Sequence, residues 1–139
     1  MDIFTKELRS WNMGRIRSKD TRPEMIVRSF LHKKGFRFRL HVKSLPGHPD
    51  IVLPKYKTVI EVRGCFWHRH EGCKKASVPS SNMDFWHNKF IANQERDKKV
   101  TCELEKLGWR VIVVWECETS QKLFPPPALV QFVSDKPSN

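Results

Sequence analysis

The chain has 139 residues, a length typical of one domain, and 39% of them are hydrophobic, which supports a core and excludes disorder throughout. Lys and Arg number 26 against 15 Asp and Glu, for a formal net charge of +11. This excess of positive charge on a small domain points to a polyanionic partner, most often nucleic acid, over a merely soluble basic protein.

The N-terminal residues and the apolar runs predict a cytoplasmic protein that needs no membrane. Residues 1–7 are charged and lack the apolar run of a signal peptide, and the longest apolar run, residues 111–115, is too short to span a bilayer. Because no export signal is visible, the four cysteines favour metal binding over two disulfides.

Residues 1–19 carry five basic side chains interleaved with Trp11 and Met13, and they follow neither a helical nor a strand period. Such a segment can lie along a phosphate backbone and insert an apolar side chain between bases. The composition equally fits a loose terminal segment. We expect a basic arm over residues 1–19, a single domain over residues 20–133 and a frayed tail over residues 134–139.

The first helix is expected to begin at residues 21–24, Thr-Arg-Pro-Glu. Thr21 as N-cap and Glu24 three residues later match a capping box, and proline is tolerated in the first turn. Gly35 ends this helix as a left-handed cap. Glu24 is either a capping carboxylate alone or one that also faces a site.

Three strands are expected to follow. Residues 36–42 alternate between apolar and basic side chains, which is typical of a strand with one buried and one basic face. A loop fixed by prolines and glycine, residues 44–49, leads to a short strand at residues 50–53. After a turn at residues 54–57, residues 58–63 form the most apolar of these strands and run into a stretch rich in Cys and His.

A long helix is expected from Asn82, or a neighbouring serine, to Gly108. Seven positions spaced alternately by four and three residues share one face, which is apolar at both ends and polar at Asn93 and Asp97. A buried carboxylate needs a cation, a donor or a metal. We therefore favour a functional role for Asp97 over a purely structural hydrogen bond.

The chain then closes with a strand at residues 109–115, whose continuous apolar run over residues 111–115 is typical of a strand covered on both faces, and a short helix at residues 128–133. The order helix, three strands, helix, strand predicts an α/β fold, a sandwich around a mixed sheet of four or five strands.

The first candidate site is acidic. Asp50 opens one strand and Glu61 lies on the next, so the two carboxylates face the same side if these strands pair as a hairpin. Two carboxylates, or one carboxylate and a main-chain carbonyl, form an oxygen site suited to Mg²⁺, and Arg63 shares the strand face of Glu61. This Pro-Asp…Glu-x-Arg pattern resembles the nuclease motif Pro-Asp…(Asp/Glu)-x-Lys; the alternative is two surface carboxylates at strand ends.

The second candidate site is a zinc site. Cys65, His70 and Cys73 have the spacing of zinc ligands, and a closed tetrahedral site needs a fourth. The candidates are His68, Cys102 and Cys117. We favour Cys117, which follows a strand where strand ends and loops meet. A closed site of three thiolates and one imidazole would be structural; the alternative is free thiols on a surface loop.

The third candidate site is His68 with the aromatic residues around it. A free imidazole near a Mg²⁺ site can act as a general base toward water, and Asp97 could orient it. Phe66 and Trp67 precede it directly, and exposed aromatics beside basic residues stack on or between bases. Trp86 fits this role and a core position equally well.

Seven motifs over about residues 10 to 117 occur in an order and spacing that identify a family. They are Asn12-Met13, Asp20-Thr21-x-x-Glu24, Leu45-Pro46-Gly47-His48-Pro49-Asp50, Gly64-Cys65-Phe66-Trp67-His68-x-His70, Phe85-Trp86, Asn93-x-Glu95-Arg96-Asp97, and Leu107-Gly108-Trp109-Arg110-Val111 through Val114-Trp115-Glu116-Cys117. With them the chain resembles the very short patch repair (Vsr) DNA mismatch endonucleases of bacteria.

The resemblance implies a restriction-endonuclease-like αβββαβ fold for residues 20–133. It implies Mg²⁺-dependent, sequence-context-dependent nicking of double-stranded DNA, 5′ of the T in T:G mismatches that arise by deamination of 5-methylcytosine. A monomer is implied, acting in the bacterial cytoplasm on nucleoid DNA, with mismatch-repair matchmaker proteins and a repair polymerase as partners.

The resemblance also implies roles for individual residues. Asp50 binds Mg²⁺ with the main-chain carbonyl of Val62, while His68 activates the attacking water with support from Asp97. The implied intercalating residues are Met13, Phe66, Trp67 and Trp86. The implied ligands of the structural zinc are Cys65, His70, Cys73 and Cys117.

The chain departs from the family pattern at three places. Family members have a second catalytic histidine where this chain has Arg63, lack the acid found at Glu61, and have one residue fewer between the ligands that match His70 and Cys73. Glu61 could then bind the metal directly, and Arg63 could stabilise the pentavalent phosphate, since a guanidinium cannot act as a base at neutral pH. Two alternatives remain: a related nuclease that cuts matched DNA in restriction or mobility, and a zinc-stabilised DNA-binding module without activity.

Overall fold

A computed structural model describes residues 21–135 of the chain. The predicted arm with Met13, and residues 136–139 of the predicted tail, lie outside the described residues. In chain order the helices and strands are α2 (Arg22–Lys33), β1 (Arg39–Leu40), β2 (Ile51–Leu53), β3 (Thr58–Arg63), α3 (Met83–Lys106), β4 (Arg110–Trp115) and α4 (Pro127–Ser134). Short 3₁₀ turns follow β2 (Pro54–Tyr56) and β4 (Glu116–Thr119).

The four strands form one mixed sheet in the order β1-β2-β3-β4. The first three strands are antiparallel neighbours, and β4 runs parallel to β3 because α3 carries the chain back between them. The register pairs Ile51 with Ile60, which brings Asp50, just before β2, opposite Glu61. The predicted α/β fold with a mixed sheet of four strands is thus observed.

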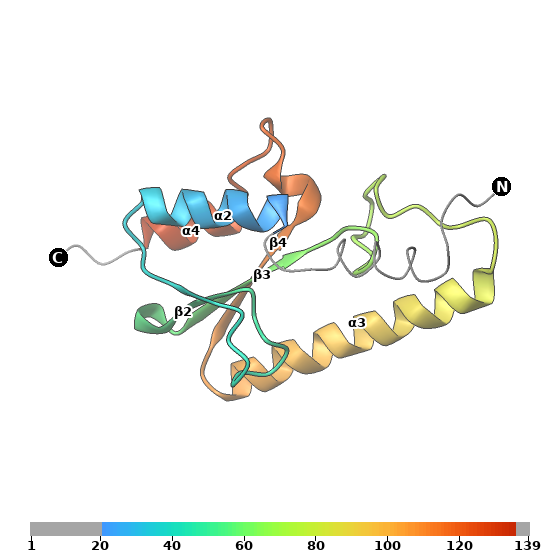
Figure 1. The fold of residues 1–139 in the computed structure, drawn as a ribbon, viewed down its shortest axis with the longest axis horizontal. Coiled ribbons are helices and arrows are strands. Elements are labelled where there is room, and N and C mark those ends of the chain that lie inside the picture. The colour runs from blue at the N-terminus through green and yellow to red at the C-terminus, as the bar shows by residue number, and fades with distance from the viewer. Residues whose placement is uncertain (1–20, 136–139) are drawn as a thin grey trace, which may run out of the picture.

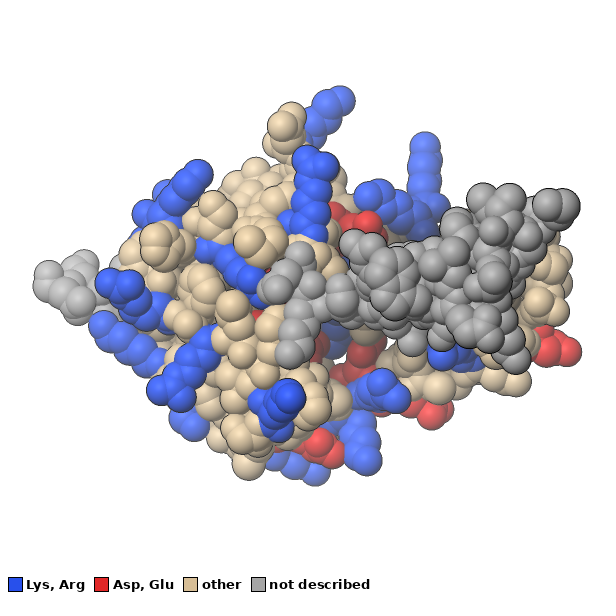
Figure 2. Space-filling view, in the orientation of Figure 1, with Lys and Arg blue, Asp and Glu red and all other residues tan. Residues whose placement is uncertain are grey.

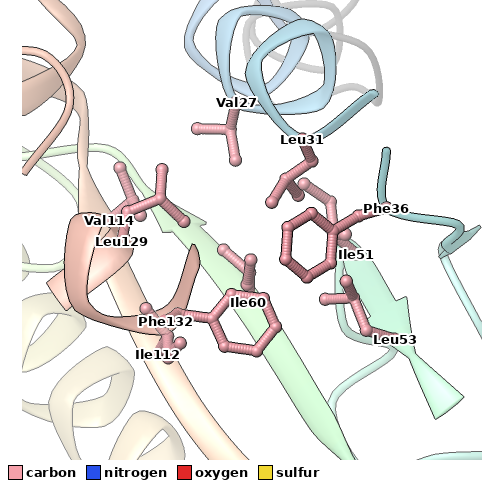
Figure 3. Close-up of a cluster of buried hydrophobic side chains, with 10 residues drawn as sticks. All are labelled: Val27, Leu31, Phe36, Ile51, Leu53, Ile60, Ile112, Val114, Leu129 and Phe132. Carbon is pink, nitrogen blue, oxygen red and sulfur yellow. The ribbon is translucent and has the colours of Figure 1, made fainter. Parts of the chain in front are cut away.

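Helices cover both faces of the sheet (Figure 1). On one face α2 and α4 pack on the strands through ten buried side chains (Figure 3): Val27, Leu31, Phe36, Ile51, Leu53, Ile60, Ile112, Val114, Leu129 and Phe132. On the other face a smaller cluster of Val52, Val59 and Leu104 joins the C-terminal half of α3 to the sheet. The described helices include none with the length and apolar character needed to cross a bilayer.

The strand predicted over residues 36–42 is shorter than expected. Phe36 and Phe38 pack toward the core as the alternation predicts, but only two residues, in β1, pair with a neighbouring strand. The pairing ends because His41 adopts a left-handed conformation, with φ 49°. Leu40 consequently stays 40% exposed, and the chain turns into the loop before β2.

The caps of α2 largely follow the prediction. The Thr21 Oγ1 accepts a hydrogen bond from the Glu24 N–H at 3.4 Å, and Gly35, with φ 86°, follows the last turn as a left-handed cap. The Glu24 side chain is 4% exposed and forms an ion pair with Arg28 inside the fold. The carboxylate therefore faces the interior of the fold.

Candidate active site and metal-binding cluster

A cavity of about 620 Å³ lies where the start of α2, the loop before β2, the end of β3 and the middle of α3 meet. It is lined by all six side chains predicted to be catalytic: Glu24, Asp50, Glu61, Arg63, His68 and Asp97. Phe66 and Trp67 line it as well. Five separate segments of the chain therefore contribute to one site: residues 21–24, 47–50, 61–68 and 93–100, and Glu116.

Asp50 is placed at the centre of the acidic part of this cavity. Its Oδ2 accepts a hydrogen bond from the Val62 N–H at 2.9 Å, which ties the carboxylate to the main chain of β3. Burial raises the pKa of Asp50 to about 7, and the neighbouring carboxylates of Glu24 and Glu61 add to this rise while the Val62 N–H opposes it. Such crowding of carboxylates is relieved by a bound cation, and their oxygen donors suit Mg²⁺.

The structure adds His41 to the predicted acidic site. Its Nε2 lies 3.4 Å from Glu24 Oε2, and its Nδ1 lies 3.9 Å from Asp50 Oδ1. Ligand atoms of these three residues all lie within 4.8 Å of one another. The sequence carried no signal for this position, because an alternating strand pattern assigned His41 to an exposed basic face.

Glu61 and Arg63 form an ion pair at the edge of the same cavity. The Arg63 Nη2 donates to Glu61 Oε2 at 2.7 Å and to the Thr101 hydroxyl on α3 at 3.5 Å. The Arg63 Nε is buried and has no hydrogen-bond partner among residues 21–135. The carboxylate of Glu61 is thus engaged by a guanidinium, and it stands outside the group that Glu24, His41 and Asp50 form.

His68 and Asp97 form a hydrogen-bonded dyad. The His68 Nδ1 lies 2.7 Å from Asp97 Oδ2, and because a carboxylate only accepts, the imidazole carries its proton on Nδ1. The Nε2 lone pair is then the basic position of the ring. Nearby, the Asn93 side chain donates to the Trp67 carbonyl at 3.1 Å. The two polar positions on the inner face of α3 therefore hold the segment that carries His68.

A second group, which we call the thiol cluster, consists of Cys65, His70, Cys73 and Cys117, with ligand atoms all within 4.8 Å of one another. The His70 Nδ1 lies 3.6 Å from Cys65 Sγ and 3.3 Å from Cys117 Sγ. The fourth cysteine, Cys102, is exposed on α3 and does not join this group.

The thiol cluster is held in place by packing and has thiols of unequal acidity. The His70 ring stacks on Trp115 with centroids 4.2 Å apart and an angle of 8°. Burial raises the pKa of Cys65 to about 12, whereas a hydrogen bond from the Lys75 N–H lowers the pKa of Cys73. Three sulfurs and one imidazole nitrogen form a donor set that fits a tetrahedral, thiophilic ion.

Aromatic side chains gather between the thiol cluster and the start of α3. The Phe66 ring lies 5.2 Å from Trp67 and 5.6 Å from Trp86, and Trp86 in turn lies 5.8 Å from Phe90. Of these four, only Phe90 is buried. The three predicted DNA-contacting rings in the described part of the chain are therefore neighbours and partly open to solvent.

Lys and Arg side chains project from many parts of the face shown in Figure 2, around a hollow in which acidic side chains are visible. A basic surface around an acidic pocket is the arrangement expected where a phosphate backbone is bound near a metal site.

Comparisons with known proteins agree on one group of enzymes. A family model described as DNA mismatch endonuclease Vsr matches residues 1–75. The Neisseria meningitidis protein Type II nicking enzyme V.NmeAIP is 54% identical over 121 residues, 87% of this chain and 86% of that protein. Type II nicking enzyme V.XorIIP of Xanthomonas oryzae is 51% identical over 119 residues, 86% and 87% of the two chains. DNA mismatch endonuclease Vsr of Escherichia coli is 44% identical over 116 residues, 84% of this chain and 74% of that protein.

Proposed function

The chain belongs to the Vsr family of DNA mismatch endonucleases, and from this membership we propose that it nicks double-stranded DNA 5′ of the T in a T:G mismatch. That it is an endonuclease follows from its relatives, which are named as mismatch endonucleases and nicking enzymes. What we propose beyond this is the substrate: a T:G mismatch, which arises when 5-methylcytosine is deaminated. The observation that supports it most is that the carboxylates of Glu24 and Asp50 and the His68–Asp97 dyad line a single cavity.

In this proposal Asp50 and the main-chain carbonyl of Val62 hold Mg²⁺. The carboxylate is fixed by the Val62 N–H, so its oxygens are positioned before a substrate arrives. Mg²⁺ bound there would polarise the scissile phosphate and stabilise the charge that develops on it. Glu61 lies opposite Asp50, but its pair with Arg63 favours a role in holding Arg63 over direct metal binding.

His68 is proposed as the general base. Its Nε2 takes a proton from the attacking water, and Asp97 stabilises the imidazolium that forms and keeps the ring oriented. General bases of this kind contribute about 10²- to 10⁴-fold in rate. Arg63 is proposed to donate to a phosphate oxygen, since its buried Nε has no partner in the described chain and the side chain lines the cavity.

The thiol cluster is proposed to hold a structural Zn²⁺. A site closed by four protein ligands leaves no open position for water, so the ion would stabilise the fold of the loop between β3 and α3 without entering the chemistry. That loop carries Phe66, Trp67 and His68, and zinc would thereby set the position of the base and of the stacking rings.

The aromatic neighbours are proposed to enter the DNA beside the mismatch. Phe66, Trp67 and Trp86 lie together beside the cavity, and a mismatched pair is easier to unstack than a matched one. Selection of the T:G pair would then come from the lower free energy of opening the stack there.

The test is incubation of the zinc-loaded protein and Mg²⁺ with labelled duplexes that contain one T:G pair or the matched pair. We expect one nick, 5′ of the T, only in the mismatched duplex. The Asp50→Asn variant should lose nicking and keep DNA binding, while Asp135→Asn, a change at an exposed residue at the end of α4, should keep both. A folded wild-type protein that leaves the T:G duplex intact would rule the proposal out.

A second candidate function is nicking of matched DNA at a recognition sequence. It is favoured by the two relatives that are more than half identical to this chain and are named Type II nicking enzymes. Cleavage of matched duplexes, dependent on sequence and on Asp50, would select this function over mismatch repair.

A further inference from the structure

His41 lies at the acidic site, and the proposed mechanism does not use it. The residue follows β1, and its main-chain N–H donates to the Asp50 carbonyl at 3.1 Å. Its φ of 49° turns the imidazole out of the strand pattern and between Glu24 and Asp50, where the side chain is 15% exposed. A left-handed backbone at a residue other than glycine is uncommon and often marks a functional position.

The two ring nitrogens have different neighbours. The Nε2 lies 3.1 Å from Arg28 Nη2 and 3.4 Å from Glu24 Oε2, whereas the Nδ1 lies 3.9 Å from Asp50 Oδ1. The separation at Nδ1 is too long for a hydrogen bond. Two atoms that are each about 2.1 Å from one divalent ion lie at most about 4.2 Å apart. The gap between His41 and Asp50 is therefore of the size that a shared ion would bridge.

We propose that His41 Nδ1 and the Asp50 carboxylate bind the same divalent cation, with Glu24 accepting a hydrogen bond from His41 Nε2. This rests on the proposed role of Asp50 as a metal ligand. Arg28 only donates, so without a cation Nε2 is the acceptor and the proton is on Nδ1. On binding, the imidazole changes tautomer: the proton moves from Nδ1 to Nε2, the hydrogen bond from Arg28 is given up, and Nε2–H donates to Glu24 instead.

The resulting arrangement is a carboxylate–histidine–metal triad, in which the carboxylate fixes the ring and its tautomer. Buried Glu24 suits this role, because its ion pair with Arg28 holds the carboxylate in place. An imidazole ligand also changes the preferred ion. Mg²⁺ takes oxygen ligands almost exclusively, whereas Mn²⁺ accepts nitrogen, so the site should bind Mn²⁺ more tightly than Mg²⁺.

The test compares His41→Asn with His48→Asn. Both histidines have positive φ, 49° and 47°, and asparagine tolerates this conformation, so the backbone change is matched. His48 lines the same cavity but is not part of the group of potential ligands. Mn²⁺ is added to the zinc-loaded protein. The electron paramagnetic resonance spectrum of the ion reports both its affinity and any nitrogen bound to it.

We expect nitrogen hyperfine coupling to Mn²⁺ in the wild-type protein and in His48→Asn, and its loss in His41→Asn. The affinity for Mn²⁺ should fall about 10- to 100-fold in His41→Asn, and the affinity for Mg²⁺, measured by competition, should fall less. If His41→Asn does not fold, the wild-type protein can be prepared with histidine enriched in nitrogen-15. The hyperfine coupling to Mn²⁺ should then change from that of nitrogen-14 to that of nitrogen-15.

The outcomes separate this proposal from the proposed function. Mn²⁺ that binds through Asp50 without nitrogen coupling, or with coupling retained in His41→Asn, overturns the role of His41 and leaves the nicking proposal intact. Failure of Mn²⁺ to bind, or binding indifferent to Asp50→Asn, overturns both the role of His41 and the metal assignment of Asp50. Nitrogen coupling together with no nicking of T:G duplexes would support His41 and reject the proposed substrate.

Discussion

Asp50, the proposed metal ligand, links the stability of the fold to pH through its protonation. The folded-state pKa of about 7 lies above the value near 4 of an unfolded chain, so the folded protein binds more protons between these two values. Without divalent cations, stability should therefore fall as pH rises from about 4 to 7 and stay low above it. A divalent cation at Asp50 competes with the proton and should restore stability above pH 7.

Asp50→Asn provides the measurement. For the zinc-loaded protein in buffer without added divalent cations, the free energy of unfolding of wild-type protein should drop by about 1–2 kcal/mol relative to Asp50→Asn between pH 5 and 8. The full pKa shift would give more, but 32% of the side chain is exposed and water screens its neighbours. Parallel pH profiles for the two proteins would contradict the assigned shift.

Every described side chain that the proposed mechanism uses was first named from a sequence motif; the structure brings these side chains into one cavity, and their roles remain predictions. Each belongs to a short local pattern, such as Pro49-Asp50 or the polar positions Asn93 and Asp97 on an otherwise apolar helix face. The place of His41 in the acidic site could not be predicted, because it depends on a backbone turn at His41 itself and on how α2 packs beside it. The pairing of Glu61 with Arg63 likewise depends on side-chain geometry that spacing does not determine.

The loop before β2 is positioned by its contact with α3. Gly47 has φ +73°, and a Cβ there would lie 2.5 Å from Val100 Cγ1. Gly47→Ala should therefore destabilise the protein by about 2–3 kcal/mol, from the left-handed backbone and the clash together. Gly72→Ala is the matched control, with φ +74° and no atom of the described chain within 4 Å of the added Cβ, and should lose only about 1 kcal/mol.

Denaturant unfolding of both variants measures this difference, and Val100→Ala should partly rescue Gly47→Ala. Because the same loop carries Asp50, nicking by Gly47→Ala should also fall. Equal losses of stability in the two glycine variants would show that contact with α3 does not fix the loop.

The loop between β3 and α3 should depend on its metal. Cys117→Ser removes a ligand of the thiol cluster, whereas Cys102→Ser changes an exposed thiol on α3. We expect the first variant to lose about one equivalent of zinc and to melt several degrees lower, because metal binding contributes directly to folding. Cys102→Ser should match wild-type protein in zinc content, measured by elemental analysis, and in melting temperature, measured by thermal unfolding. Equal zinc loss would reject Cys117 as the fourth ligand.

Elements were predicted best where the pattern is local. Strand β3 has the predicted bounds of residues 58–63, because its apolar run is covered on both sides. The strand expected over residues 36–42 was wrong in length, because His41 leaves the extended conformation, and the alternation of side chains does not reveal this backbone turn.

For the whole molecule, the net charge of +11 should dominate binding to matched DNA. Each phosphate contact releases counterions, so the logarithm of affinity should fall with the logarithm of salt concentration at a slope steeper than about −4. Fluorescence anisotropy with a matched duplex between 50 and 200 mM KCl measures it. A slope near zero would mean that the basic face does not contact the backbone. Mismatched duplexes should bind more tightly with a similar slope, because stacking is less sensitive to salt.

The two halves of helix α3 differ in how much they contribute to the core. Its second half is fixed on the sheet by Leu104. Its first two turns, which carry Phe85 and Trp86, extend beyond the main core (Figure 1). Asp97 lies between these two parts. Residues 83–85, 87 and 88 are exposed, whereas Trp86 packs on neighbouring rings. Changes at these exposed positions should cost little stability, which makes them the natural place to diversify in a library selected for new DNA targets.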